Sequence, residues 1–107
     1  MSTESVIRHH IQALADGDLG AIMDDYAATC VFISNDQLIR GVAGIRSVFE
    51  RAVANGGFAV EMRHEIYHGT TAYITWTVPG LIDLGTDTFI VENDEITLQT
   101  SAVAMTK

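Results

Sequence analysis

Two side chains of this sequence combine a proton-transferring group with a position that faces an apolar interior. His10 stands between Ile7 and Leu14 at helical spacing, so it shares the apolar face of its predicted helix. Asp87 stands two residues before Phe89 in a β-like segment, so the two side chains share one face of that strand. An imidazole exchanges protons near neutral pH, and burial raises the pKa of a carboxyl group until it can hold a proton. The pair therefore predicts acid–base chemistry inside a cavity.

Both residues also have purely structural interpretations. His10 would then be a core histidine that hydrogen-bonds to backbone, and Asp87 a solvent-exposed residue at the start of its strand, near Asp83. A third arrangement pairs the two directly, so that the carboxylate of Asp87 orients the imidazole of His10. The sequence leaves these alternatives open.

Aromatic side chains, a methionine and one amide supply candidate walls for such a cavity. Trp76 is the single indole and the preferred ligand contact, while Gln99 would add a polar point on the last strand. Gln99 and Leu98 are neighbours on that strand and therefore point to opposite faces. The sequence leaves open which of these two faces is the inward one. Most of these residues must also serve as core, because a small domain needs its aromatic side chains for packing. The candidate ligand-binding residues are Tyr26, Phe32, Phe49, Met62, Trp76, Phe89 and Gln99.

The elements that position these residues follow an order of helices first and strands later. Apolar spacing predicts helices over residues 5–15, 19–26 and 42–54, capped by Ser2 or Thr3 and by Asp18. Period-two patterns and turn residues predict strands over 30–34, 38–40, 58–68, 72–78, 83–91 or 86–91, and 95–105. The alternation in 58–68 groups Met62, His64 and Ile66 on one face.

This order predicts an α+β fold. We expect three N-terminal helices packed on a strongly curved, mostly antiparallel sheet, which forms a cone with an apolar pocket. The 107 residues are long enough for one domain, so we expect a single domain over residues 1–107.

Charge and composition limit the classes of partner. The formal net charge is −8, and six Lys and Arg cannot neutralise a run of phosphates, so nucleic acid and anionic membranes are disfavoured. The single cysteine, Cys30, lies in an apolar run and is interpreted as a buried small side chain. The sequence shows no leader pattern and no apolar run of membrane-spanning length, so we expect a cytoplasmic protein.

A metal ion or an organic cofactor is not expected. His64 and His68 stand four residues apart on a predicted strand, which separates them by roughly 13 Å, too far for one ion. The sequence contains no phosphate-binding loop and no dinucleotide fingerprint.

Segments spread over nearly the whole chain resemble, in order, the SnoaL-like polyketide cyclase and steroid Δ-isomerase superfamily, which has the nuclear transport factor two-like fold. The first carries the Gly17-Asp18 turn between two helices, and the last carries the hairpin that begins Thr86-Asp87-Thr88-Phe89. The resembling segments are residues 11–22, 25–32, 41–49 and 86–96.

The resemblance implies a cone-shaped fold around a small apolar ligand. Isomerases, cyclases, dehydratases, epoxide hydrolases and non-enzymes share this fold, so the fold alone does not select an activity. In the steroid isomerases, the positions that match His10 and Asp87 bind the substrate oxyanion. Their general base matches Ser34, which is a departure that puts steroid isomerisation in doubt.

The resemblance also implies a partner. Members of this superfamily commonly dimerise through the outer face of the sheet, which here would carry Tyr73, Thr75 and Thr77. We therefore expect a homodimer that binds a small apolar molecule. The alternative is a non-catalytic ligand-binding or assembly module of the same fold.

Overall fold

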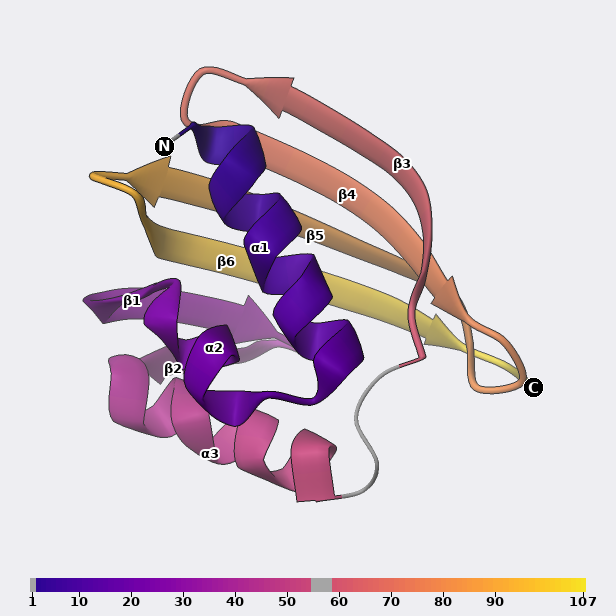
Figure 1. Cartoon of the computed structure of the whole chain (residues 1–107). Coiled ribbons are helices and arrows are strands. Elements are labelled where there is room, and N and C mark those ends of the chain that lie inside the picture. Colours follow the sequence, from indigo (N-terminus) through magenta and orange to yellow (C-terminus); the bar gives the residue numbers. More distant parts are fainter. Residues whose placement is uncertain (1, 55–58) are drawn as a thin grey trace.

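The computed structural model describes residues 2–54 and 59–107, in which three helices accompany one six-stranded sheet (Figure 1). The helices are α1 (Thr3–Asp16), α2 (Leu19–Asp24) and α3 (Val42–Ala54). The strands are β1 (Tyr26–Ser34), β2 (Gln37–Arg40), β3 (Glu61–His68), β4 (Thr71–Val78), β5 (Ile82–Glu92) and β6 (Glu95–Met105). They lie in the order β2-β1-β6-β5-β4-β3, and only β1 and β6 pair in parallel.

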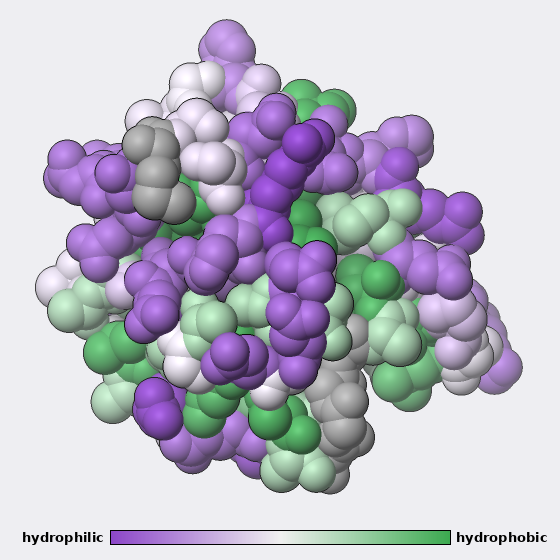
Figure 2. Space-filling view, viewed as in Figure 1, coloured by the Kyte–Doolittle hydropathy of each residue, from purple (hydrophilic) through white to green (hydrophobic). Residues whose placement is uncertain are grey.

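The sheet bends around helix α1, which crosses its concave face, while α2 and α3 lie at the β1 and β2 end (Figure 1). Val6 and Ile7 of α1 and Ile45 of α3 are fully buried, so the helices close the sheet over an apolar interior. From the helix side, the exposed surface of α1 is hydrophilic, and hydrophobic side chains reach the surface on both sides of it (Figure 2). The predicted α+β cone is confirmed.

Capping residues define where α1 begins and ends. Ser2 accepts a hydrogen bond from the Ser5 N–H, and Gly17 ends the helix at φ 64°, a conformation that favours glycine. Asp18 then caps α2 by accepting from the Ala21 N–H. His10 shares the buried face of this helix with Val6, Ile7 and Ala13 and is 0% exposed, as its spacing predicts.

Helix α2 ends earlier, and the first strand begins earlier, than predicted. Tyr26, placed by its spacing at the end of a helix, begins β1 and pairs with Ile96 of β6. The cause is a long-range contact, because the Ile96 N–H already donates to the backbone carbonyl of Asp25 at 2.7 Å.

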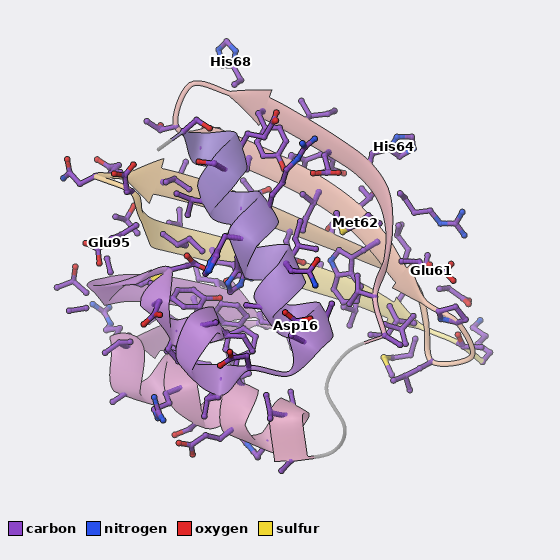
Figure 3. All side chains as sticks on the ribbon, viewed as in Figure 1. Asp16, Glu61, Met62, His64, His68 and Glu95 are labelled. Carbon is purple, nitrogen blue, oxygen red and sulfur yellow. The ribbon has the colours of Figure 1, made fainter. Side chains whose placement is uncertain are left out.

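The alternation predicted for residues 58–68 is wrong over part of its length. The pairing of β3 with β4 shifts between Met62 and His64, so Met62 lies opposite Trp76 while His64 lies opposite Thr75. Such a bulge exchanges the two faces of a strand. Met62 therefore points to the concave side, whereas His64 points away from it (Figure 3). Ile66 shares the outer face and is 59% exposed.

The remaining element boundaries concern β5, α3 and the start of the strand predicted at Phe58. Strand β5 starts at Ile82, and helix α3 has the bounds that its spacing predicts. The predicted helix end at 55–57 and strand start at Phe58 lie outside the described residues. No helix in the described ranges combines the length and apolar character needed to cross a membrane.

Helix α3 depends on Ile45 for its attachment to the sheet. We expect Ile45→Ala to lower the free energy of unfolding by about 2–5 kcal/mol, because it leaves a cavity beneath the helix. Urea denaturation measures this loss. Ser47→Ala, on the exposed face of the same helix, should change it by no more than about 0.5 kcal/mol. Equal effects of the two substitutions would contradict the packing of α3.

Candidate active site

Strand register lines up side chains in rows across the concave face of the sheet. Residues that lie directly opposite each other on paired strands share one face. One row joins Ser34 of β1, Ser101 of β6 and Asp87 of β5. The row beside it joins Gly85 of β5 to Trp76 of β4. Four strands therefore bring their polar side chains to the same part of the concave face.

A cavity of about 270 Å³ lies between this face and the helices. Among the described residues that line it, Asp87 is the only carboxylate, and none is Lys or Arg. Ser34, Asn35 and Ser101 add small polar groups to a lining that, apart from His10, Asp87 and Gln99, is mainly apolar. The predicted site residues that line it are His10, Phe32, Phe49, Met62, Trp76, Asp87, Phe89 and Gln99.

The Asp87 carboxylate is 7% exposed and accepts three side-chain hydrogen bonds. The Trp76 indole N–H donates to Oδ1 at 2.9 Å, and the Ser101 hydroxyl donates to the same oxygen at 3.0 Å. The Gln99 amide donates to Oδ2 at 2.8 Å. These contacts exclude a solvent-exposed aspartate at the strand start and settle the face of β6, since Gln99 and Ser101 point inward.

Burial raises the pKa of Asp87 above the ordinary value of an aspartate. The hydrogen bonds from Trp76, Gln99 and Ser101 act in the opposite direction, because they stabilise the charged form. The carboxyl group thus combines a desolvated position with three hydrogen-bond donors, which makes it a candidate functional group.

The Trp76 indole lies across Gly85, its partner on β5. A Cβ atom at Gly85 would come within 2.3 Å of the indole, so only glycine leaves room for the ring in this position. This close approach aims the indole N–H at Asp87. Gly85 is therefore part of the site although it offers no functional group.

Tyr26 lies behind the cavity lining rather than in it. Its ring packs near His10 and Phe49, with centroids 5.1 Å and 5.9 Å away, and its hydroxyl donates to the Gln99 Oε1. The same hydroxyl lies 3.2 Å from the His10 Nε2. Burial raises the pKa of Tyr26 well above its ordinary value, so this hydroxyl keeps its proton.

The carboxylate next to His10 is Asp25 rather than Asp87. The His10 Nδ1 lies 3.5 Å from the Asp25 Oδ2, and the neighbouring His9 binds the same carboxylate at 2.8 Å. The hydrogen bond to Asp25 raises the pKa of His9. Among the described residues, His10 and Asp87 are linked through Tyr26 and Gln99 and not by a hydrogen bond of their own.

Several residues of this network are absent from the predicted set, for different reasons. Gly85 carries a signal, because a glycine inside a strand pattern often marks a close approach of another group. Asp25 carries no such signal in the sequence, because only the contact of α1 with the start of β1 brings it to His10.

Cys30 is fully buried, as predicted, and burial raises its pKa to about 11.

Comparison with known proteins gives a consistent family and fold. The model of the SnoaL-like domain family matches residues 7–103. No curated protein matches the chain in sequence.

Solved structures agree with this chain in fold. An LEH-like epoxide hydrolase from M. tuberculosis has 18% identity and a TM-score of 0.80 over 95% of this chain and 82% of that one. A Kribbella flavida protein that carries the name of a ketosteroid isomerase has 13% identity and a TM-score of 0.83 over 98% and 79%. A Sinorhizobium meliloti protein named for polyketide cyclase activity has 18% identity and a TM-score of 0.81 over 91% and 93%. At these identities the likeness is one of fold.

The packing of Trp76 on Gly85 can be tested by substitution. We expect Gly85→Ala to displace the indole, shift the emission of this single tryptophan and raise the pKa of Asp87, because a hydrogen bond that lowers that pKa is lost. Fluorescence and the ¹³C shift of the Asp87 carboxyl group, followed against pH, measure both effects. Gly20→Ala on α2, where a Cβ atom meets only an ordinary contact, is the matched control. Unchanged emission in Gly85→Ala would contradict the packing.

Proposed function

This chain belongs to the SnoaL-like domain family, and on that premise we propose that its cavity binds a small, mainly apolar molecule and transforms it by acid–base chemistry without a cofactor. The reaction would be an isomerisation, a cyclisation or a hydrolysis, to which the names of its structural neighbours point, or a dehydration, which the family resemblance also implies. The observation that carries the proposal is one nearly buried carboxylate, Asp87, in the lining of an apolar cavity.

Asp87 is the group we assign to proton transfer. A carboxylate with a raised pKa is a stronger base than an exposed aspartate, and it is still ionised once the pH exceeds that pKa. One such group can take a proton from one carbon of a bound molecule and return it to another. Both ring nitrogens of His10 are turned toward Tyr26 and Asp25, so His10 would act through its neighbours.

The substrate would need one polar group besides its apolar body. Ser34 and Asp87 lie in one row with Ser101 between them, and strands about 4.8 Å apart place their backbones about 10 Å from each other. A small cyclic molecule fits between them, with its oxygen near the Ser34 hydroxyl or the Asn35 amide and its reactive carbon near Asp87. Phe32, Met62 and Phe89 would supply apolar contacts.

A non-catalytic binding module is the second candidate, and the residue at position 34 favours it. The resemblance to steroid isomerases places their general base there, whereas this chain has a serine. Such a module would bind the same small, mainly apolar molecules and leave them unchanged.

A homodimer is part of the proposal. A row of side chains crosses the outer face of the sheet, and its large members are exposed by 59% at Ile66, 38% at Tyr73, 37% at Ile33 and 52% at Leu38. A second copy of the chain would cover this row.

The division of the chain into a single domain over residues 1–107 also stays a prediction.

If Asp87 transfers the proton, replacing its carboxyl group by an amide should have a large effect on turnover. With cyclohex-3-enone and cyclohexene oxide as probes, we expect wild-type protein to form the conjugated ketone or the diol. Asp87→Asn should lower kcat/KM by about 10²–10⁴-fold, because it removes the proton-transferring group. Ultraviolet absorbance and gas chromatography measure the two products.

Ser101→Ala is the matched control. It should keep turnover but move the rising limb of kcat/KM to higher pH, because a donor that lowers the pKa of Asp87 is removed and the base form appears later. Equal turnover by wild type and Asp87→Asn would refute the assignment. Saturable binding of cyclohex-3-enone without any turnover would instead support the binding module.

The proposed dimer depends on the outer face of the sheet. We expect wild-type protein to sediment as a dimer at micromolar concentration and Tyr73→Glu to sediment as a monomer, because the substitution places a charge in the centre of the interface. Ser47→Glu adds the same charge to the exposed face of α3 and should leave the dimer intact. A monomeric wild type would remove the claim.

A further inference from the structure

The cavity carboxylate is connected to His10 of helix α1 by a chain of buried polar side chains. We infer that Gln99 and Tyr26 couple the protonation of Asp87 to the protonation of the His10 Nε2. This inference deepens the proposed function, since it concerns the same carboxylate, but its test needs no substrate. Gln99 and Tyr26 are positioning residues in this scheme.

Each step of the chain is short and shielded from water. The Gln99 Nε2 lies 2.8 Å from the Asp87 Oδ2, and the Tyr26 hydroxyl contacts both the Gln99 Oε1 and, at 3.2 Å, the His10 Nε2. Beyond the ring, the His10 Nδ1 lies 3.5 Å from the Asp25 Oδ2. Gln99, Tyr26 and His10 are 4%, 4% and 0% exposed. Their polar atoms must therefore find donors and acceptors in one another.

With Asp87 ionised, the direction of every bond follows from the carboxylate. It can only accept, so Gln99 donates its N–H to Asp87 and accepts from Tyr26 with Oε1. The one proton of Tyr26 is then used, and its oxygen accepts from a proton on the His10 Nε2. A neutral His10 has a bare Nδ1 in this arrangement, and that atom is buried without a hydrogen-bond partner.

With Asp87 protonated, the same atoms favour the opposite direction. The carboxamide of Gln99 turns by half a rotation, so that Oε1 accepts from the Asp87 O–H and Nε2 donates to the Tyr26 oxygen. Tyr26 then donates to a bare His10 Nε2, and the ring proton sits on Nδ1, where it faces the Asp25 carboxylate. A neutral His10 carries one proton in both arrangements, and the additional proton is the one on Asp87.

The orphaned Nδ1 is the observation that makes this coupling specific. A buried polar atom without a partner costs about 1–3 kcal/mol, so the first arrangement is held only by the demand of an ionised Asp87. Once that demand is removed, the second arrangement turns a proton on Nδ1 toward the Asp25 Oδ2, 3.5 Å away, in place of a bare nitrogen.

The titratable groups that face the chain leave Asp87 in control. His9 on α1 holds Asp25 from the solvent side. Burial raises the pKa of Tyr26 and that of Cys30 on β1, so both keep their protons. Among the described residues that face the cavity end of the chain, Asp87 is the carboxyl group whose ionisation reverses its direction.

Asp87→Asn is a mimic of the protonated acid, because its Nδ2 would donate to the Gln99 Oε1 while its Oδ1 accepts from Trp76 and Ser101. ¹⁵N NMR of labelled histidine shows directly which ring nitrogen carries a proton. Above the pH at which Asp87 ionises, we expect the His10 Nε2 to be protonated in wild type and bare in Asp87→Asn. A protonated Nε2 in both proteins would overturn the inference.

Titration of the wild-type protein gives a second test, which does not depend on whether a variant folds correctly. The ¹³C shift of the Asp87 carboxyl group and the ¹⁵N shift of the His10 Nε2 should change with one common midpoint. Two separate midpoints, or a His10 Nε2 that does not respond as Asp87 ionises, would overturn the coupling.

Gln99→Leu supplies the matched control, because it removes the link and keeps the approximate volume. In the Gln99→Leu background, we expect Asp87→Asn to leave the protonation of the His10 Nε2 unchanged; a change of the wild-type size would overturn the role of Gln99. Activity and coupling fail separately. Lost turnover in Asp87→Asn with an unaltered His10 rejects the coupling alone, and an altered His10 with full turnover rejects the proposed function alone.

Discussion

The placement of one carboxylate in the lining of an apolar cavity is the constraint on which the rest of this structure depends. Removing an ionised group from water costs far more free energy than one hydrogen bond can compensate, so such a group needs several hydrogen-bond donors at once. Hydrogen bonds to a charged group contribute about 1.5–3 kcal/mol each. Asp87 receives three of them, from Trp76, Gln99 and Ser101. Each donor needs support of its own, and that requirement extends from the cavity to His10 on the buried face of helix α1.

The support comes mainly from strand register. Trp76 reaches Asp87 because Gly85 lies opposite it, and Ser101 reaches the same oxygen because β5 and β6 place the two residues directly across from each other. A slip of one residue in either pairing would turn these side chains to the outer face. The bulge in β3 has a related effect, because it brings Met62 to the cavity while the same strand presents Ile66 outside. The geometry of the site is therefore a property of the whole sheet and not of one loop.

Local patterns predicted the parts of this molecule whose causes are local. Gly17 and Asp18 fix the turn between helices, the spacing around His10 gives its buried face, and the alternation around Asp87 groups it with Phe89 while leaving open whether that face points inward. Tyr26 shows where such reasoning ends, since its spacing suits a helix but its pairing with β6 makes it a strand residue. The link from His10 to Asp25 was equally invisible, because residues fifteen apart meet only when α1 lies over the start of β1. Register and helix placement are long-range quantities, and no short segment encodes them.

The same constraint limits the chemistry of the ligand. No Lys or Arg is among the described residues that line the cavity, so an anionic ligand would be buried beside Asp87 without a counter-charge. That arrangement is strongly unfavourable in an apolar surrounding. A cation would pair with Asp87 but would compete with the three donors already bound to it. A neutral molecule with one oxygen or one acidic C–H bond meets neither penalty, and it leaves Asp87 free to gain or lose a proton. The electrostatics of the cavity would thus favour a neutral ligand on physical grounds that do not depend on any family resemblance.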